Sequence, residues 1–317
     1  MLDETLFRGS RLAIVGNVCR DVKMAALPPG DYLFADGETP TGFIEETLGG
    51  GGANSALAAA ALGAEVRFGG KVGADRLGER LEQALVDRGV KSFIRRDPRV
   101  KTGSSVVLRF TNGCRHFVSC QPNNDSLAWE DVDLSILAGA EHLLRADVWF
   151  SGPMLAGGNE RLFRAARQMG LATSLDLNWD PCWNTAGAEA VAGRKAAVRQ
   201  LLPLVDLVHG NVAELNRFAD SEDLAVTLER LNAWGAGAVV IHRGAEGAGY
   251  FCGGELVVEP CAPVRECKNT AGSGDLLSVC MILLYRRGDV PIAEKLRLAN
   301  RVVAEFIEGK RTILPPL

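Results

Sequence analysis

Short apolar strands alternate with helical segments along most of this chain, and that alternation restricts the folds it can adopt. Apolar runs typical of buried strands occupy residues 11–16, 65–70, 146–151, 171–176, 204–209 and 238–242. Helical patterns lie between them, at 55–64, 75–89, 159–169 and within 188–202. Strands joined through helices form right-handed βαβ units, so the strands run parallel and helices cover both faces. The sequence therefore predicts a three-layer αβα fold with a mostly parallel central sheet.

Two segments interrupt this alternation, at about 18–48 and 101–120. Prolines and glycines break the first into short pieces, whereas Asn112-Gly113 in the second is the turn signal of a β-hairpin between 104–110 and 115–119. We expect both segments to project from one edge of a single domain spanning 1–317, as a small β-sheet lid. Short strands leave open edges that a second copy of the chain would cover, so we also expect a homodimer formed through the lid.

Composition excludes several classes of protein. The 317 residues carry a formal net charge of −4 and no basic run, which argues against nucleic acid as a partner. No stretch approaches the roughly 18 apolar residues of a membrane span. Asp3 and Glu4 lie where an export signal would be basic, and the eight cysteines contain no C-x-x-C pair. These features predict a cytoplasmic protein with free thiols.

The segment Gly272-Ser273-Gly274-Asp275 carries most of the chemical information. It leads into an almost wholly apolar helix, where small residues let backbone N–H groups approach an anion and the helix N-terminus favours a phosphate. Asp275 places a carboxylate beside that anion site, where an attacking alcohol could lose its proton. The simpler alternative is a turn in which Asp275 only caps the helix.

A second glycine cluster, Gly49 to Gly52, precedes Asn54 and an alanine-rich helix that Gly63 ends. Four glycines allow close approach to a ligand, and Asn54 offers both a donor and an acceptor. A tight strand-to-helix crossover packed on alanine is the structural alternative.

In open α/β sheets ligands bind at the carboxyl ends of the strands, where loops beginning at Gly16, Gly49, Asn211 and Asn269 would converge.

In four motifs the chain resembles the ribokinase-like, PfkB-type carbohydrate kinases over essentially its whole length. Residues 49–54 with 72–78 resemble the N-terminal signature of that family, and residues 269–275 resemble its C-terminal signature, D-T-x-G-A-G-D. Residues 16–21 are similar to its first-strand G-x-x-x-x-D, and 211–214 match its N-x-x-E motif. The resemblance implies ATP-dependent phosphorylation of a hydroxyl on a small sugar or sugar derivative, with Mg²⁺.

The resemblance also implies roles for individual residues. Asp275 would be the general base, and the backbone of Gly272, Ser273, Gly274 and Asp275 would form the anion hole. Asp21, Gly50, Gly51 and Asn54 would hold sugar hydroxyls. Asn211 and Glu214 would organise Mg²⁺ and the phosphates, largely through water. Arg243, Gly244, Gly247 and Asn300 would lie along the nucleotide.

Three positions depart from the family pattern. Asn269 replaces an Asp associated with a monovalent cation, so we expect little activation by K⁺; Ser273 replaces an Ala. Asp180 stands where many members have an Arg linked to the phosphate side. A nucleoside kinase of the same family, with Phe34, Phe43, Phe110 or Phe117 under the base, remains an alternative, as does a non-catalytic sugar-binding protein. The four histidines form no cluster in the sequence, which argues against histidine catalysis or a metal site.

Overall fold

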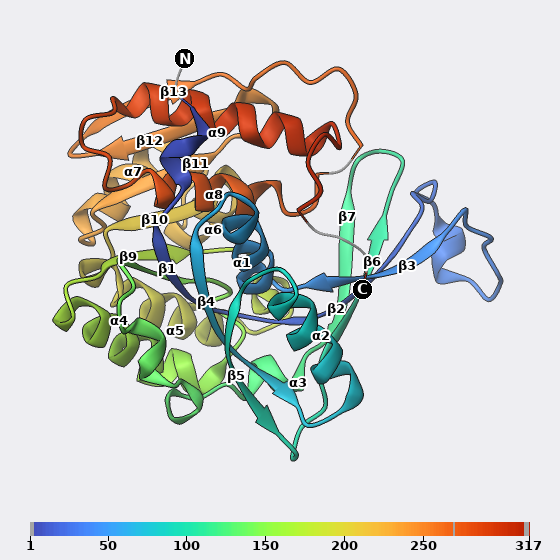
Figure 1. The fold of residues 1–317 in the computed structure, drawn as a ribbon. Helices are drawn as coiled ribbons and strands as arrows, with labels where there is room; N and C mark the ends of the chain where they lie inside the picture. Colours follow the sequence, from blue (N-terminus) through green and yellow to red (C-terminus); the bar gives the residue numbers. More distant parts are fainter. Residues whose placement is uncertain (1–2, 269, 314–316) are drawn as a thin grey trace.

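The computed structural model describes residues 3–268, 270–313 and 317. Within them, nine strands form one sheet in the order β13-β12-β11-β10-β9-β8-β1-β4-β5 (Figure 1). The strands are β1 (Arg11–Val15), β4 (Glu65–Gly73), β5 (Lys91–Asp97), β8 (His142–Arg145), β9 (Ala172–Asp176), β10 (Leu207–Asn211), β11 (Ala238–His242), β12 (Ala248–Cys252) and β13 (Glu255–Glu259). Every neighbouring pair from β5 to β11 is parallel, and the pairs β11–β12 and β12–β13 are antiparallel. The predicted mostly parallel sheet is confirmed.

Helices cover both faces of this sheet. One face carries α1 (Gly51–Ala61), α2 (Arg76–Val86), α8 (Ser273–Leu283) and α9 (Ile292–Ile307). The other carries α4 (Asn159–Gln168), α5 (Ala188–Arg199), α6 (Val212–Ala219) and α7 (Leu224–Ala233), while the short α3 (Pro122–Asp125) follows β7. Side chains of a strand alternate between faces, so Leu12 and Ile14 of β1 join the first core and Ala13 and Val15 the second. The result is the three-layer arrangement expected from the sequence.

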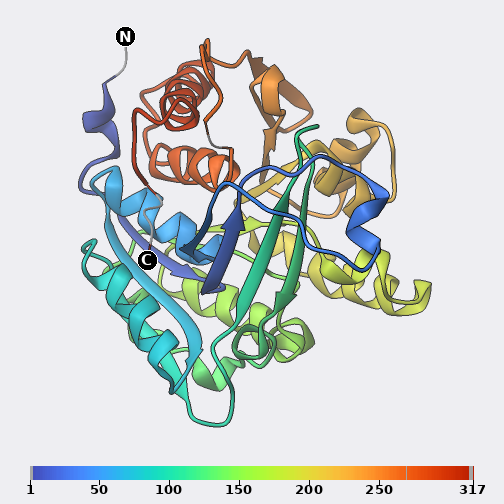
Figure 2. The same cartoon turned by 90° about the vertical axis from the view of Figure 1, so that its right-hand side faces the viewer.

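A smaller sheet projects to one side of this body (Figures 1 and 2). Its strands lie in the order β3 (Ile44–Gly49), β2 (Cys19–Met24), β6 (Ser104–Arg109) and β7 (Arg115–Cys120). The pairs β2–β3 and β6–β7 are antiparallel and the central pair β2–β6 is parallel. Both interrupting segments thus contribute to one small sheet, separate from the central one, as predicted. In the part of the chain that the structure describes, no helix is both long and apolar enough to cross a bilayer.

The prediction of a strand at 146–151 is wrong. The strand is β8, four residues earlier, and residues 146–151 form the loop after it. His142 and Arg145 make β8 look too polar to be buried, but each has a partner: His142 Nε2 lies 2.7 Å from Ser174 Oγ, and Arg145 Nε donates to Asn159 Oδ1 at 2.7 Å. The left-handed conformation of Asp147, with φ 56°, turns the chain out of the sheet.

Other boundaries also differ from the prediction. Helix α1 begins inside the glycine cluster at Gly51, and β10 lies at 207–211 instead of 204–209 because a short 3₁₀ turn occupies Leu202–Leu204. Strands β5, β12 and β13 have no counterpart among the predicted elements.

Candidate active site

The candidate site lies where the parallel strands of the central sheet end. Strands β1, β9, β10 and β11 end at this edge, and the glycine cluster after β3 packs against the end of β1: a Cβ on Gly16 would lie 2.7 Å from the Cα of Gly52. The loops that begin at Gly16 and Gly49 therefore meet, as expected. Asn269, the predicted start of another converging loop, lies outside the described residues.

Asp275 joins the two glycine-rich motifs directly. It lies in the first turn of α8, and Asn54 in the first turn of α1 donates from Nδ2 to its Oδ2 at 3.1 Å, across 221 residues of sequence. Burial, and next the negative charge of Asp147, raise the pKa of Asp275 to about 7. A carboxylate with this pKa accepts a proton near neutral pH.

The loop before Asp275 turns tightly into helix α8. Gly272 is the N-cap of α8 and has φ 84°, a left-handed conformation that favours glycine. No side chain caps the helix there. The first N–H groups of a helix have no intrahelical acceptor. The Ser273 N–H donates to the carbonyl oxygen of Thr270 at 3.3 Å, so the N–H groups of Gly274 and Asp275 are the donors that the first turn of α8 could offer an anion.

The first glycine cluster is held together by a residue that the sequence did not reveal, Asp147. Its carboxylate accepts N–H groups from Asn17 at 3.0 Å, Gly51 at 3.2 Å and Gly52 at 2.8 Å. Burial raises the pKa of Asp147 even so. A single acid in the apolar run Ala146–Phe150, immediately after a strand, is the signal that could have identified it.

Asp21 faces the same region from β2 and is only 9% exposed. A side chain on Gly49 would overlap the Asp21 carboxylate, and Gly50 has φ 95°, so both glycines are required by close packing. Burial raises the pKa of Asp21, an effect opposed by Lys23. The buried Oδ1 atoms of Asn17 and Asn54 have no hydrogen-bond partner among the described residues. Such acceptors suit a ligand that brings hydroxyl groups.

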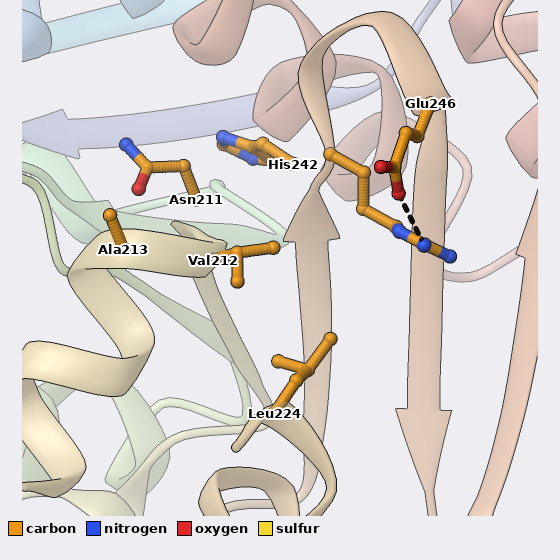
Figure 3. A pocket seen from close by; sticks show the side chains of 7 residues that line it. Asn211, Val212, Ala213, Leu224, His242 and Glu246 are labelled. Atoms are coloured by element: carbon orange, nitrogen blue, oxygen red, sulfur yellow. Dashed lines mark hydrogen bonds and ion pairs between the residues drawn. The ribbon is translucent and has the colours of Figure 1, made fainter. Parts of the chain in front are cut away.

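An open pocket of about 410 Å³ adjoins this region at the ends of β10 and β11 (Figure 3). It is lined by Asn211, Val212, Ala213, Leu224, His242, Arg243 and Glu246. Asn211 and Glu214 cap α6 reciprocally: Asn211 Oδ1 accepts the Glu214 N–H at 2.9 Å, and Glu214 Oε2 accepts the Asn211 N–H at 2.8 Å. Burial raises the pKa of Glu214 to about 7.

Of the other residues predicted along the nucleotide, Arg243 lines this pocket, whereas Gly244, Gly247 and Asn300 are not among the residues that line it. Arg243 pairs with Glu246 at 2.6 Å, as the dashed line in Figure 3 marks. Gly244 has φ 59°. Gly247 has φ 96°, and a side chain there would overlap the backbone of Glu259 and Pro260. Asn300 donates to the carbonyl oxygens of the same two residues, at 3.1 and 2.9 Å. Gly247 and Asn300 therefore fix the chain that follows β13.

Asp180, where Arg was expected from the family pattern, is fully buried and binds Arg194, with Oδ2 at 2.8 Å from Nε and Oδ1 at 2.8 Å from Nη2. Two of the four histidines share one partner in the structure, because His142 and His209 both hydrogen-bond Ser174 Oγ, at 2.7 and 3.2 Å. His242 contacts Ser278, which contacts Asp176. His142 is buried and His242 is half-buried, and desolvation lowers the pKa of His142 to about 3 and that of His242 to about 4.

The donor set fits a hydrated magnesium ion better than a directly coordinated one. Burial is the largest cause of a raised pKa at five acids of the site, Asp21, Asp147, Asp176, Glu214 and Asp275. A cation would relieve this accumulation of buried negative charge. Within 3–268, 270–313 and 317, no three His, Cys, Asp or Glu side chains converge as a metal site. Mg²⁺ retains water readily, so Glu214 would hold it through water molecules.

Comparison with known proteins shows to which family the chain is similar. The family model of the pfkB family carbohydrate kinases matches residues 10–316. The chain is 24% identical to a ribokinase of Arabidopsis thaliana over 317 residues, covering 95% of this chain and 77% of that protein. It is 25% identical to a fructokinase of Klebsiella pneumoniae over 293 residues, covering 89% and 92%.

A solved structure shows the same fold. It is that of an E. coli protein provisionally assigned as ribokinase II, in complex with ATP and Mg²⁺. It superposes with a TM-score of 0.78 at 20% identity and covers 94% of this chain and 93% of that one. Because the family model spans nearly the whole chain, this protein belongs to the pfkB family of carbohydrate kinases.

Proposed function

We propose that this protein transfers the γ-phosphoryl group of ATP to a hydroxyl of a small sugar or sugar derivative, with Asp275 as general base. The observation that carries the proposal is the position of Asp275 beside the uncapped first turn of α8, with a pKa of about 7. General bases work best when their pKa lies near the operating pH. The contact with Asn54 orients the Asp275 carboxylate toward the sugar side of the site.

In the proposed reaction, Asp21 and the orphaned acceptors of Asn17 and Asn54 position the sugar. The Asp275 carboxylate takes the proton of the acceptor hydroxyl. That oxygen forms a bond to the γ-phosphorus, and the bond from the γ-phosphorus to the bridging oxygen breaks, leaving its electron pair on ADP. Backbone N–H groups of Gly272 to Asp275 stabilise the charge on the transferring group, the main requirement of phosphoryl transfer.

Glu214 would hold Mg²⁺ through water, and when bound the ion supplies positive charge next to the phosphates. Asn211 holds Glu214 in place through the reciprocal cap of α6. Because Glu214 has a pKa of about 7 without a cation, it is only partly ionised near neutral pH, and positive charge nearby favours the ionised carboxylate.

The small sheet serves as the lid over the sugar, and its two faces have different roles. The strand register puts Phe117 on the same face as Asp21, because the directly opposed rows Asp21–Ser105–Ser119 and Lys23–Val107–Phe117 are two residues apart. The other face carries Ile44, Val106 and Val118, which are 66%, 36% and 56% exposed. Exposed β-branched residues on a sheet with open edges suit pairing with a second copy, which makes the protein a homodimer.

A nucleoside is the second candidate for the acceptor, and Phe117 is the observation that favours it. Its ring is 51% exposed on the face that carries Asp21. An aromatic ring offers a stacking surface for a nucleobase. For a nucleoside acceptor, Phe117→Ala would raise KM for the nucleoside with little change in kcat, whereas a small polyol would be affected much less.

The test of the proposal is ADP release from Mg²⁺-ATP across a panel of sugars, sugar acids and nucleosides. With the acceptor identified, Asp275→Ala lowers kcat by about 10²–10⁴, the usual contribution of a general base. Asp223→Asn is the matched control, because Asp223 only caps α7 at the surface and Asn is an equally good N-cap. Near wild-type turnover of Asp275→Ala would refute the role of Asp275 as base.

A further inference from the structure

His242 lies between the pocket and the anion-hole loop. It is the last residue of β11 and pairs in register with Asn211 of β10, so both side chains extend from neighbouring strand ends into the pocket region (Figure 3). On its other side, a Cβ built on Gly274 would lie 3.2 Å from His242 Nδ1 and 3.6 Å from Cε1. The Nδ1 edge of the imidazole therefore lies directly against the glycine at the centre of the anion-hole loop.

The opposite edge of the ring is fixed by a buried chain of hydrogen bonds. His242 Nε2 lies 3.1 Å from Ser278 Oγ, and Ser278 Oγ lies 3.1 Å from Asp176 Oδ2. Ser278 is fully buried and Asp176 is 2% exposed, so water does not compete for the contact between these two residues. Nδ1, by contrast, makes no hydrogen bond to any described residue.

Ser278 has only one hydroxyl proton, so the protonation state of Asp176 determines which nitrogen of His242 carries the proton. If Asp176 is ionised, Ser278 donates to it, His242 Nε2 carries the proton, and a bare lone pair on Nδ1 faces the anion hole. If Asp176 is protonated, it donates to Ser278, Ser278 donates to Nε2, and Nδ1 carries an N–H that faces the anion hole. Only the second arrangement attracts a phosphate oxygen.

The surroundings favour the second arrangement. Burial, followed by the charges of Asp275 and Glu214, raises the pKa of Asp176 well above its ordinary range, and burial keeps the imidazole of His242 neutral. The titratable groups that act on these residues are Asp275 on α8, Glu214 on α6, Asp147 after β8 and His209 on β10, and the Arg243–Glu246 pair follows His242 after β11. Arg243 is already paired with Glu246, and the guanidinium of Arg194 is paired with Asp180.

We propose that His242 is a phosphate-binding residue of this enzyme, which donates its Nδ1–H to an oxygen of the nucleotide triphosphate, and that Ser278 and Asp176 are the positioning residues that fix this tautomer. This inference rests on the proposed function, because it concerns the nucleotide of the same reaction. In this proposal a neutral side chain, His242, supplies a hydrogen-bond donor to the phosphate in addition to the backbone N–H groups of the loop before α8.

Two substitutions of His242 separate donation by Nδ1 from packing. The amide nitrogen of His242→Asn occupies the position of Nδ1 and keeps a donor toward the loop. His242→Gln places its amide near the position of Nε2, which keeps the Ser278 contact and removes the donor. The measurement is the Kd of Mg²⁺-ADP and of Mg²⁺ with the β,γ-imido analogue of ATP, by calorimetry. We expect His242→Asn to remain within about threefold of wild type and His242→Gln to bind the ATP analogue about 10- to 100-fold more weakly, the loss of one hydrogen bond to a charged group.

The positioning residues supply the second comparison. Asp176→Asn offers Ser278 a permanent N–H donor, as protonated Asp176 does, and should bind the ATP analogue as well as wild type. Ser278→Ala breaks the chain and should bind it about 10-fold more weakly. Equal affinities of His242→Asn and His242→Gln, or tight binding by Ser278→Ala, would overturn the assignment of His242. Failure of the wild-type protein to bind either nucleotide would instead refute the proposed kinase function.

Discussion

Replacing Asp275 by Asn should stabilise the protein while abolishing most of its activity, because the fold holds this carboxylate in a position that disfavours its charge. The pKa of Asp275 is raised from 3.8 to about 7. About three pKa units at about 1.4 kcal/mol each set an upper limit of about 4 kcal/mol of destabilisation by the ionised group. Partial contact with solvent reduces this figure, so we expect Asp275→Asn to increase the free energy of unfolding by about 2 kcal/mol at pH 8.

The sign of the pH dependence follows from the same shift. The folded state holds the Asp275 proton more tightly than the unfolded chain, so ionisation destabilises the fold above pH 4, and the cost grows until the pH passes the folded pKa of about 7. Asn does not titrate. The gain from Asp275→Asn should therefore be largest at pH 8 and fall to a few tenths of a kcal/mol near pH 4.

Urea unfolding of the ligand-free protein at pH 4.5, 6 and 8 measures this difference, with Asp223→Asn as the matched acid-to-amide control. Asn54 can still donate to the carbonyl oxygen of Asn at 275, so the contact between α1 and α8 is preserved. A stability gain that is absent at pH 8, or that does not change between pH 4.5 and 8, would contradict the assignment of a buried, destabilised carboxylate to Asp275.

Four further results are expected. Because the base must be ionised, kcat/KM of the wild-type enzyme should rise about tenfold per pH unit below pH 7 and level off above it; a flat profile from pH 5.5 to 8 would exclude titration of Asp275. Asp147→Asn keeps one oxygen for the N–H groups of Asn17 and Gly52 but sets an amide NH₂ against that of Gly51, so it should lower the free energy of unfolding by about 2 kcal/mol in urea titrations; an unchanged midpoint would mean that this contact is dispensable. Val118→Asp on the outer face of the small sheet should convert a dimer into a monomer in light scattering, and a monomeric wild-type protein would end the dimer proposal. Turnover should change little when K⁺ replaces an inert cation at equal ionic strength, whereas Asn269→Asp should increase cation dependence; many-fold activation of the wild-type enzyme by K⁺ would refute this.

The periodicity of apolar residues predicts most strands of the central sheet, but it does not predict the strand at its centre. The strands at 11–15, 172–176 and 238–242 are apolar runs, and burial on both faces requires that pattern. Strand β8 lies between β1 and β9 yet carries His142 and Arg145, whose partners Ser174 and Asn159 come from elsewhere in the chain. Hydropathy along the sequence does not reveal such partners, so the apolar run after the strand was mistaken for the strand itself.

The candidate site likewise contains residues that the sequence identifies and residues that only the folded structure identifies. Asp275 and Asn54 belong to motifs whose local composition already indicates chemistry, and the structure places them in contact. Asp147 has no motif; its importance arises from N–H groups on two loops about 95 and 130 residues away in sequence. The relation of His242 to Ser278 and Asp176 likewise requires β9, β11 and α8 to be packed together before it exists.

The packing of α8 against α1, where Asn54 contacts Asp275, also has a consequence for folding during synthesis. Ribosomes synthesise proteins from the N-terminus, and α8 covers the same face of the sheet as α1, so α1 and β1 lack part of their cover until the last tenth or so of the chain has emerged. An almost wholly apolar helix that arrives this late leaves an exposed hydrophobic face on every shorter nascent chain. Truncation before α8 should therefore yield aggregation and chaperone binding in place of a smaller, weakly active enzyme.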